Sequence, residues 1–291
     1  MVGHREAVSS VRKWATSKWI EALRVVFLPT WFAAISGYWL YLNFRAGISL
    51  HDTQYLEATR RWLSGVDPWA TAYPGWFAAP PISLVPLVPF AVIPYGDWLL
   101  IACGLAAAVA TLRRLGRPLY WLLFPPLFIG LFGGGADVWL PLLILSGLGP
   151  VAVLGKVYAL VPMVILGRWR AVIGAAALVA LTWPVLPWGS YIAQFTTIQG
   201  HLAEQAAGLS APLVAVPVVV VSLVVMGRQR AAWMTVPALW PSTQFYYGTL
   251  ALPALTLPAA AIMAIPSPWA VVGACVVLAA TSVLRVPDPS Y

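Results

Sequence analysis

Acidic side chains are scarce in this sequence. Only nine Asp and Glu residues occur in 291, and charged residues of both signs make up 9% of the chain, whereas a typical soluble domain has about 25%. Hydrophobic residues make up 61% and recur in runs along the whole length. This composition argues against an ordinary soluble protein. It predicts an all-α, polytopic membrane protein of about nine to eleven spans, with residues 1–291 forming one membrane domain.

Cysteine and paired carboxylates are also sparse. The two cysteines, Cys103 and Cys275, both stand in apolar runs, and we expect small core residues rather than a disulfide or a metal pair. No Asp-x-Asp pair occurs in the chain, which argues against a divalent metal that holds a nucleotide-sugar diphosphate. We therefore expect chemistry that needs no metal and no bound cofactor.

Positive charge is in excess, at a formal net charge of +8. In a soluble protein this value would suggest nucleic acid as a partner. Here most basic residues flank apolar runs, where they orient membrane spans and contact anionic lipid. We expect membrane lipid as a partner and no nucleic acid. Residues 1–21 predict a basic amphipathic segment on the cytoplasmic surface. The loop that follows the first span, of about residues 22–44, is then expected outside.

This first outer loop, residues 45–80, holds three of the nine carboxylates, Asp52, Glu57 and Asp67. Asp52 stands just before a helical pattern whose apolar face is formed by Tyr55, Leu56, Thr59, Trp62 and Leu63. The pattern predicts a helix that lies along the membrane surface and ends at Gly65.

Two interpretations of Asp52 remain open. A glycosyl transfer needs a base that takes the proton of the acceptor hydroxyl, and a carboxylate at the membrane rim suits that role. The same residue type in the same position also suits a helix N-cap. His51 beside it could orient the acceptor or be an ordinary surface histidine. Asp67 before Pro68 is typical of a turn start, and contact with a substrate is the alternative.

A second constellation lies in the middle of the chain. The run Gly133–Asp137 breaks an apolar segment, and the apolar pieces that follow are too short for full spans, which predicts half-helices. Lys156 is the only lysine after residue 18 and stands among apolar neighbours. It could neutralise a phosphate or extend from a helix end to the interface. Asp137 could cap a half-helix or pair with Lys156.

Three further groups are candidates for substrate contacts. His201 and Glu204 share a helical face in a second polar outer loop, residues 188–211, where contact with a sugar or an ordinary solvated face is expected. Gln244 and Tyr247 could stack on and hydrogen-bond a sugar, or serve as interfacial aromatics. Strict alternation of spans puts Arg113, Arg114 and Arg117 outside, against the positive-inside tendency. Either one span is re-entrant or these arginines face an anionic ligand.

These motifs, in this order, resemble the GT-C superfamily of membrane glycosyltransferases, and most closely glycosyltransferase family 87, which uses polyprenyl-phosphate-mannose. The similarity rests on Asp52, Tyr55, the run Gly65-Val66-Asp67-Pro68-Trp69 and Pro80-Pro81. It extends to Gly133–Asp137, Lys156-Val157-Tyr158 and Pro241–Pro253. The family often has a histidine in the late aromatic stretch where this chain has tyrosine, near Tyr247.

The resemblance implies a seven-span module with surface helices in the first outer loop, in a bacterial plasma membrane. It implies inverting transfer of a sugar, with mannose expected, from a polyprenyl-phosphate donor to a glycolipid or glycan acceptor on the outer face. Asp52 would be the general base and Lys156 would meet the donor phosphate. A flippase or scramblase for polyprenyl-linked sugars, or a degenerate assembly partner, is the alternative.

Overall fold

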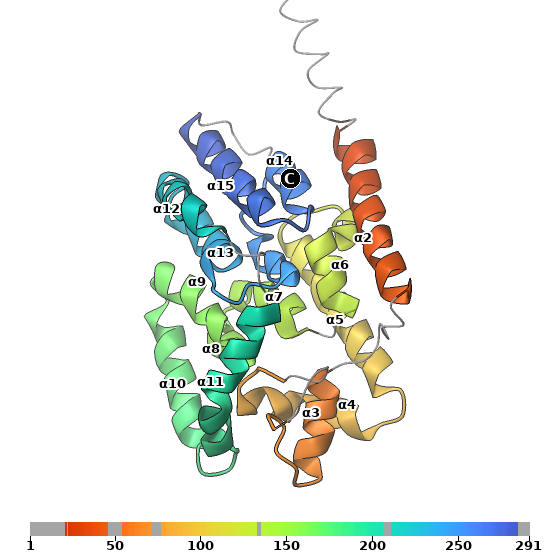
Figure 1. Cartoon of the computed structure of the whole chain (residues 1–291), viewed down its shortest axis with the longest axis vertical. Coiled ribbons are helices and arrows are strands. Elements are labelled where there is room, and N and C mark those ends of the chain that lie inside the picture. The colour runs from red at the N-terminus through yellow and green to blue at the C-terminus, as the bar shows by residue number, and fades with distance from the viewer. Residues whose placement is uncertain are drawn as a thin grey trace, which may run out of the picture.

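The chain folds into a bundle of short helices (Figure 1). The structure is a computed structural model, and it describes residues 21, 23–45, 54–70, 77–132, 135–205 and 211–284. Every regular element within these ranges is helical, which confirms the expected all-α class. The predicted cytoplasmic segment, residues 1–21, lies almost entirely outside the described residues.

The α-helices of the described ranges are α2 (Leu28–Arg45), α3 (Gln54–Leu63), α4 (Val88–Val92), α5 (Gly96–Arg114), α6 (Pro125–Phe132), α7 (Leu140–Leu145), α8 (Gly149–Gly155), α9 (Leu160–Ile165), α10 (Trp169–Thr182), α11 (Trp188–Gln205), α12 (Val216–Val225), α13 (Arg228–Leu239), α14 (Leu257–Met263) and α15 (Pro268–Val283). Short segments of other helix types are η1 (Leu23–Phe27), η2 (Pro81–Leu87), η3 (Leu119–Leu123), η4 (Ala136–Val138), η5 (Val157–Ala159), η6 (Leu213–Ala215) and η7 (Phe245–Ala251).

Proline accounts for much of this fragmentation. The chain has 26 prolines, and the first turns of α7, α8, α12, α14 and α15 each contain one. Proline suits the first helical turn, where its missing N–H would have no partner, but it interrupts a helix further in. The half-helices expected after Gly133 are therefore confirmed as α7, α8 and α9.

Two helices in the described ranges are long and apolar enough to cross a membrane, Arg24–Arg45 and Gly96–Arg114. Five shorter apolar helices have 10 to 17 residues. The expected nine to eleven spans are thus not confirmed. One reason is local: the segment expected as a second span is a 3-10 turn followed by the five-residue helix α4, because Pro86 and Pro89 interrupt it.

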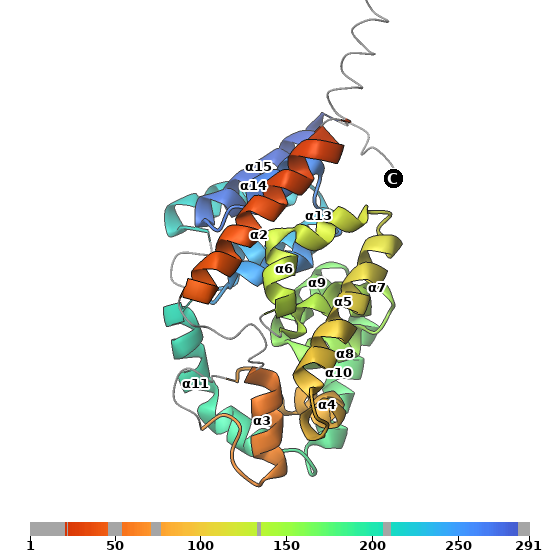
Figure 2. The same ribbon diagram turned by 90° about the vertical axis from the view of Figure 1, so that its right-hand side faces the viewer.

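We call residues 81–96 the hairpin: it consists of the short helical segment Pro81–Val92 and the tight turn that leads into α5. Helices α3 and α4 lie together at one end of the molecule, and α5 rises from beside α4 toward the other end (Figure 2). The turn into α5 is tight, since a Cβ at Gly96 would lie 1.7 Å from the Phe90 carbonyl oxygen. A helix of 19 residues is about 28 Å long, so Arg113 and Arg114 stand at the far end of α5 from α3. Which side of a membrane these arginines face stays a prediction.

Helix α2 closes one side of the bundle. It packs against α6, η3 and α14, and its buried Phe32 contacts the rings of Trp121 and Phe124. The indole of Trp31 donates a hydrogen bond of 2.9 Å to the Ala261 carbonyl. The first predicted span is thereby connected to α14, near the end of the chain.

Candidate functional site

The site is built where two helix breaks meet. Asp137 lies in η4, directly after the glycine break, and Lys156 lies in extended conformation between α8 and η5. The Lys156 ammonium is 3.8 Å from a carboxylate oxygen of Asp137, and the two side chains are 10% and 2% exposed. The ion pair that the sequence analysis left open is therefore present. In the bundle, η4 packs against η7 and α6, and η5 packs against α8 and α9.

Three tyrosine rings surround the Lys156 ammonium. The nitrogen lies 5.3 Å from the centroid of Tyr55 and 5.9 Å from those of Tyr158 and Tyr247. These distances are within the range in which a ring face attracts a cation. Tyr158 and Tyr247 also pack on each other, with centroids 4.3 Å apart. Four separate parts of the chain thus converge on one buried lysine.

Several polar atoms of this cluster have no hydrogen-bond partner among the described residues. They are the two carboxylate oxygens of Asp137 and the hydroxyls of Tyr55 and Tyr158. Buried polar groups are nearly always hydrogen-bonded, and an unpaired one costs about 1–3 kcal/mol. The cluster therefore combines a buried cation with unsatisfied donors and acceptors, which is the composition of a site for a polar, anionic ligand.

An apolar cavity of about 530 Å³ ends against this cluster. Tyr55, Ala136 and Gly155 are part of its wall and adjoin or contact the ion pair. The rest of the wall is apolar and comes from the hairpin, α5, α7, α8 and α10. Among the lining residues, Val85 and Val151 are 46% and 47% exposed, so the cavity opens sideways between the hairpin and α8. Its volume is typical of small-molecule sites.

Tyr55 reaches the site from α3. The helix expected in this part of the chain is confirmed as α3, and it ends as predicted, with Gly65 at a φ of 79°. Its position along a membrane surface stays a prediction. Burial of the Tyr55 hydroxyl raises its pKa, and the neighbouring Lys156 only partly opposes this effect. Tyr55 therefore stays neutral at pH 7 and keeps a proton that it can donate to a ligand.

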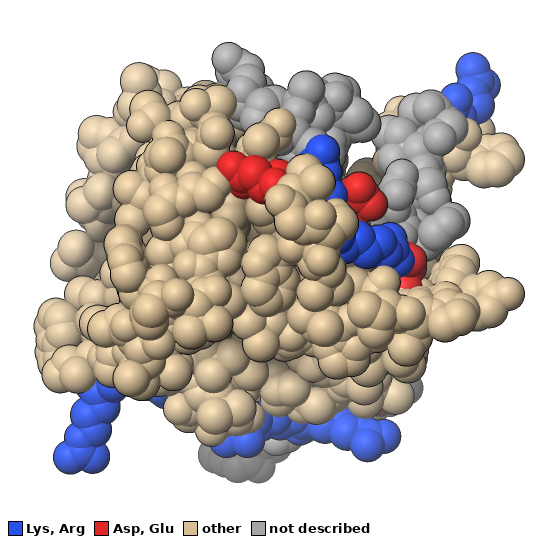
Figure 3. Space-filling view, turned by 90° about the horizontal axis from the view of Figure 1, so that it is seen from below, with Lys and Arg blue, Asp and Glu red and all other residues tan. Residues whose placement is uncertain are grey.

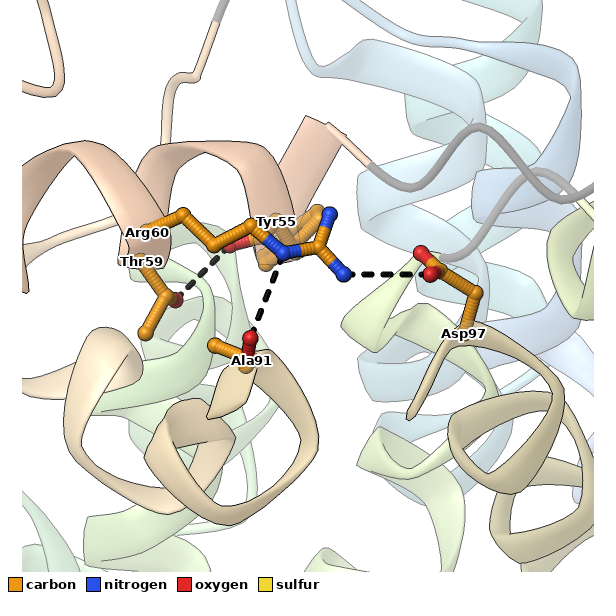
Figure 4. Close-up of polar contacts among 5 residues, drawn as sticks. All are labelled: Tyr55, Thr59, Arg60, Ala91 and Asp97. Carbon is orange, nitrogen blue, oxygen red and sulfur yellow. Dashed lines mark hydrogen bonds and ion pairs between the residues drawn. The ribbon is translucent and has the colours of Figure 1, made fainter. Parts of the chain in front are cut away.

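Arg60 connects α3 to the hairpin that walls the cavity. Its guanidinium lies 3.2 Å from the Asp97 carboxylate and 3.3 Å from the Ala91 carbonyl oxygen, one turn of α3 beyond Tyr55 (Figure 4). Thr59 donates back to the Tyr55 carbonyl at 2.8 Å. The helix that brings Tyr55 to the site is thus attached to the start of α5.

Asp67 has a structural role in the described residues. One carboxylate oxygen accepts the backbone N–H of Trp69 at 2.9 Å, and the other accepts the hydroxyl of Ser190. The Trp69 ring packs on Tyr191, 5.4 Å between centroids. The turn interpretation is confirmed. The segment expected as a second polar loop contains the helix α11, as the helical spacing of His201 and Glu204 suggested, and Trp188, Tyr191 and Ile198 lie on its buried face.

The arginines expected near a donor phosphate have other surroundings. Arg117 is buried and donates to the carbonyls of Leu252 and Leu255 at 2.8 and 2.5 Å, over the ring of Trp121. Arg113 and Arg114 are exposed at the end of α5. The part of α5 that lines the cavity is Leu100–Gly104, more than two turns earlier. Nothing in the described geometry supports the phosphate role of these three arginines.

Four candidates lie where the structure gives no side-chain description. Asp52 and His51 fall outside the described residues, and the side chains of His201 and Glu204 are not described. The amide nitrogen of Gln244 is buried without a hydrogen-bond partner among the described residues, but Gln244 lines a separate small pocket.

Within the described ranges there is no group of three or more potential metal ligands. The expectation of metal-free chemistry stays a prediction.

Charge is unevenly distributed over the surface. Seen from the α3–α4 end, the acidic side chains in view lie in one half of the face, while its opposite edge shows basic ones (Figure 3). The described acidic residues of the α3–α5 region are Glu57, Asp67 and Asp97.

Sequence reasoning missed Tyr158 as a ring on Lys156 and Ser190 as the partner of Asp67. Tyr158 stands two residues after Lys156, within the motif already noted, so its position was the available signal. For Ser190 there was none, because it is 123 residues from Asp67.

No family model matches this chain. No curated protein and no solved structure matches it either.

Proposed function

We propose that this protein is a membrane glycosyltransferase that moves a sugar, with mannose expected, from a polyprenyl-phosphate donor to a hydroxyl of a glycolipid or glycan acceptor. The observation that carries the proposal is a 530 Å³ apolar cavity whose wall includes Tyr55, the ring that contacts the buried Lys156 ammonium. A phosphate needs a cation, a polyprenyl chain needs an apolar channel, and the two features adjoin.

The side opening of the cavity supports a lipid donor. An aqueous substrate would enter through a polar mouth, whereas Val85 and Val151 give this opening an apolar rim. If the chain lies in a bilayer, a polyprenyl tail can enter from the hydrocarbon without crossing water. The phosphate would then lie near Lys156. Burial of a charged group in a membrane protein costs free energy, so such a group is expected to have a function, and here that function would be to bind the phosphate.

The proposed reaction needs three groups. The acceptor hydroxyl gives its proton to Asp52 as its oxygen attacks the anomeric carbon, and the bond from that carbon to the phosphate oxygen breaks with its electron pair going to the phosphate. Lys156 stabilises the charge that develops there. Asp52 lies outside the described residues, and its role as the base is proposed from the sequence.

A transfer assay tests this assignment. In vesicles with labelled polyprenyl-phosphate-mannose, Asp52→Asn should abolish sugar transfer and leave donor binding intact, because only the base is lost. Asp67→Asn is the matched control: its carboxylate is in the same loop but holds Trp69 and Ser190, so transfer should persist. Transfer by Asp52→Asn at the unaltered rate would refute the assignment.

The same vesicles separate the alternative function. A flippase would move the labelled donor between leaflets without forming product, and Asp52→Asn would leave that movement unchanged. Product formation that requires both Asp52 and Lys156 supports the transferase.

A further inference from the structure

Asp137 is a buried carboxylate whose hydrogen-bonding capacity is unused. It is 2% exposed, and within the described part of the chain neither of its oxygens has a hydrogen-bond partner. The Lys156 ammonium at 3.8 Å is beyond hydrogen-bond distance. The Asp137 carboxylate lies close to the backbone of Gly135. A Cβ at position 135 would approach the Oδ2 atom of Asp137 to 2.9 Å, so glycine leaves room for the carboxylate.

An anion cannot complete this site alone. A phosphate bound at Lys156 would repel the adjacent carboxylate, and it offers Asp137 no hydrogen-bond donor when it is a diester. A ligand that binds Lys156, Tyr55 and Asp137 together must have two different parts. One part must be an anionic acceptor for Lys156 and Tyr55, and the other must be a hydroxyl donor for Asp137.

We propose that Asp137 accepts a hydrogen bond from the C2 hydroxyl of the sugar in the donor, and so selects the sugar. This inference rests on the proposed function. In a sugar joined to phosphate at its anomeric carbon, the C2 hydroxyl is the hydroxyl separated from phosphorus by the fewest bonds. Asp137 is the carboxylate in contact with the cation that would hold the phosphate. The C2 hydroxyl, the hydroxyl nearest the phosphorus, would therefore lie beside the Asp137 carboxylate, which is next to the cation that holds the phosphate.

The geometry gives a sugar preference at C2. Mannose and glucose differ only in the configuration of that carbon, and a 2-deoxy sugar lacks the hydroxyl. Either change would leave a buried carboxylate without its donor. Sites that are built to hydrogen-bond a hydroxyl reject analogues that lack it strongly, for this reason.

Binding of four lipids in detergent micelles tests the inference: polyprenyl phosphate without a sugar, and its mannose, glucose and 2-deoxymannose esters. The unaltered protein should bind the mannose ester at least about tenfold more tightly than the 2-deoxy ester, as expected for loss of a hydrogen bond to a charged group. In Asp137→Asn this ratio should fall toward one. The sugar-free lipid should bind Asp137→Asn as tightly as before or more tightly, since a repelling charge is gone.

Each failure has a distinct pattern. If none of the four lipids binds in a way that Lys156→Ala weakens, the proposed function fails. If the lipids bind through Lys156, but Asp137→Asn lowers the affinity for sugar-free and sugar-bearing lipids equally, Asp137 is only the counter-ion of Lys156. If Asp137→Asn does not fold, the comparison of mannose and 2-deoxymannose esters on the unaltered protein decides alone, and equal affinities overturn the inference.

Discussion

Replacement of Lys156 by methionine should destabilise the protein strongly, because it leaves the buried Asp137 carboxylate without its cation. At 3.8 Å and an effective dielectric constant of about 20, the attraction between the two charges is about 4 kcal/mol. Removal of one partner of a buried pair typically costs about 3–5 kcal/mol. Methionine approximates the shape of the lysine stem, so packing losses stay small.

The reverse change should cost less. In Asp137→Asn the ammonium keeps the faces of Tyr55, Tyr158 and Tyr247, each worth about 0.5–2 kcal/mol. The carboxylate has no comparable second partner in the described residues. The double variant Lys156→Met/Asp137→Asn buries no charge and should recover most of the stability.

Thermal unfolding in detergent without lipid donor measures this cycle. Since 1 kcal/mol shifts the midpoint by roughly 2–4 °C in a chain of this order of size, Lys156→Met should unfold about 10 °C lower and the double variant close to the unaltered protein. Arg170→Met, at an exposed position, controls for loss of a cation and should shift the midpoint little. Equal midpoints for Lys156→Met and the double variant would show that the two side chains do not form an ion pair.

Three other predictions follow from the hairpin and its attachments. Gly96→Ala should prevent folding or lower the yield severely, because its Cβ would overlap the Phe90 carbonyl oxygen, whereas Gly37→Ala, with nothing within 4 Å, should express normally; equal yields would contradict the turn geometry. Arg60→Gln should lower the unfolding midpoint only slightly, since the Arg60 and Asp97 side chains are 42% and 21% exposed and exposed pairs contribute about 0–1 kcal/mol; a large loss measured in the same detergent assay would show that the pair is buried. With Cys103 and Cys275 replaced, single cysteines at Ser64 and Arg114 should react with an impermeant thiol reagent from opposite sides of sealed vesicles, and reaction from the same side would refute the hairpin topology.

The sequence predicted local features well. Polar and apolar spacing placed α3, Gly65 marked its end, and the glycine and proline breaks marked the half-helices. These signals lie within a few residues of the structure they determine. The pairing of Lys156 with Asp137 was one of two alternatives, because two rare charges in apolar segments have few ways to be compensated.

Contacts between distant segments could not be predicted. The hairpin was expected as a span from its apolar residues alone, and its packing against α3 could not be read from the sequence. Arg117 was assigned to a phosphate because charge alone does not reveal that Leu252 and Leu255, 135 and 138 residues away, present free carbonyls. The side chains of Asp52 and His201 lie beyond what the structure describes, so their roles stay predictions.

The short helices have a consequence for the amino-acid usage of the chain. Each interrupted helix ends in carbonyl oxygens that lack their partners within the helix, and side chains can donate to them alongside the N–H groups of the following turn. At two such ends an arginine donates to them: Arg168 to the carbonyl of Ile144 at the end of α7, and Arg228 to that of Ile165 at the end of α9. The planar, multiply donating guanidinium suits this task better than a lysine ammonium. The basic character of this protein is therefore partly a by-product of its broken helices, and exchange of these arginines for lysine would keep the net charge while loosening the fold.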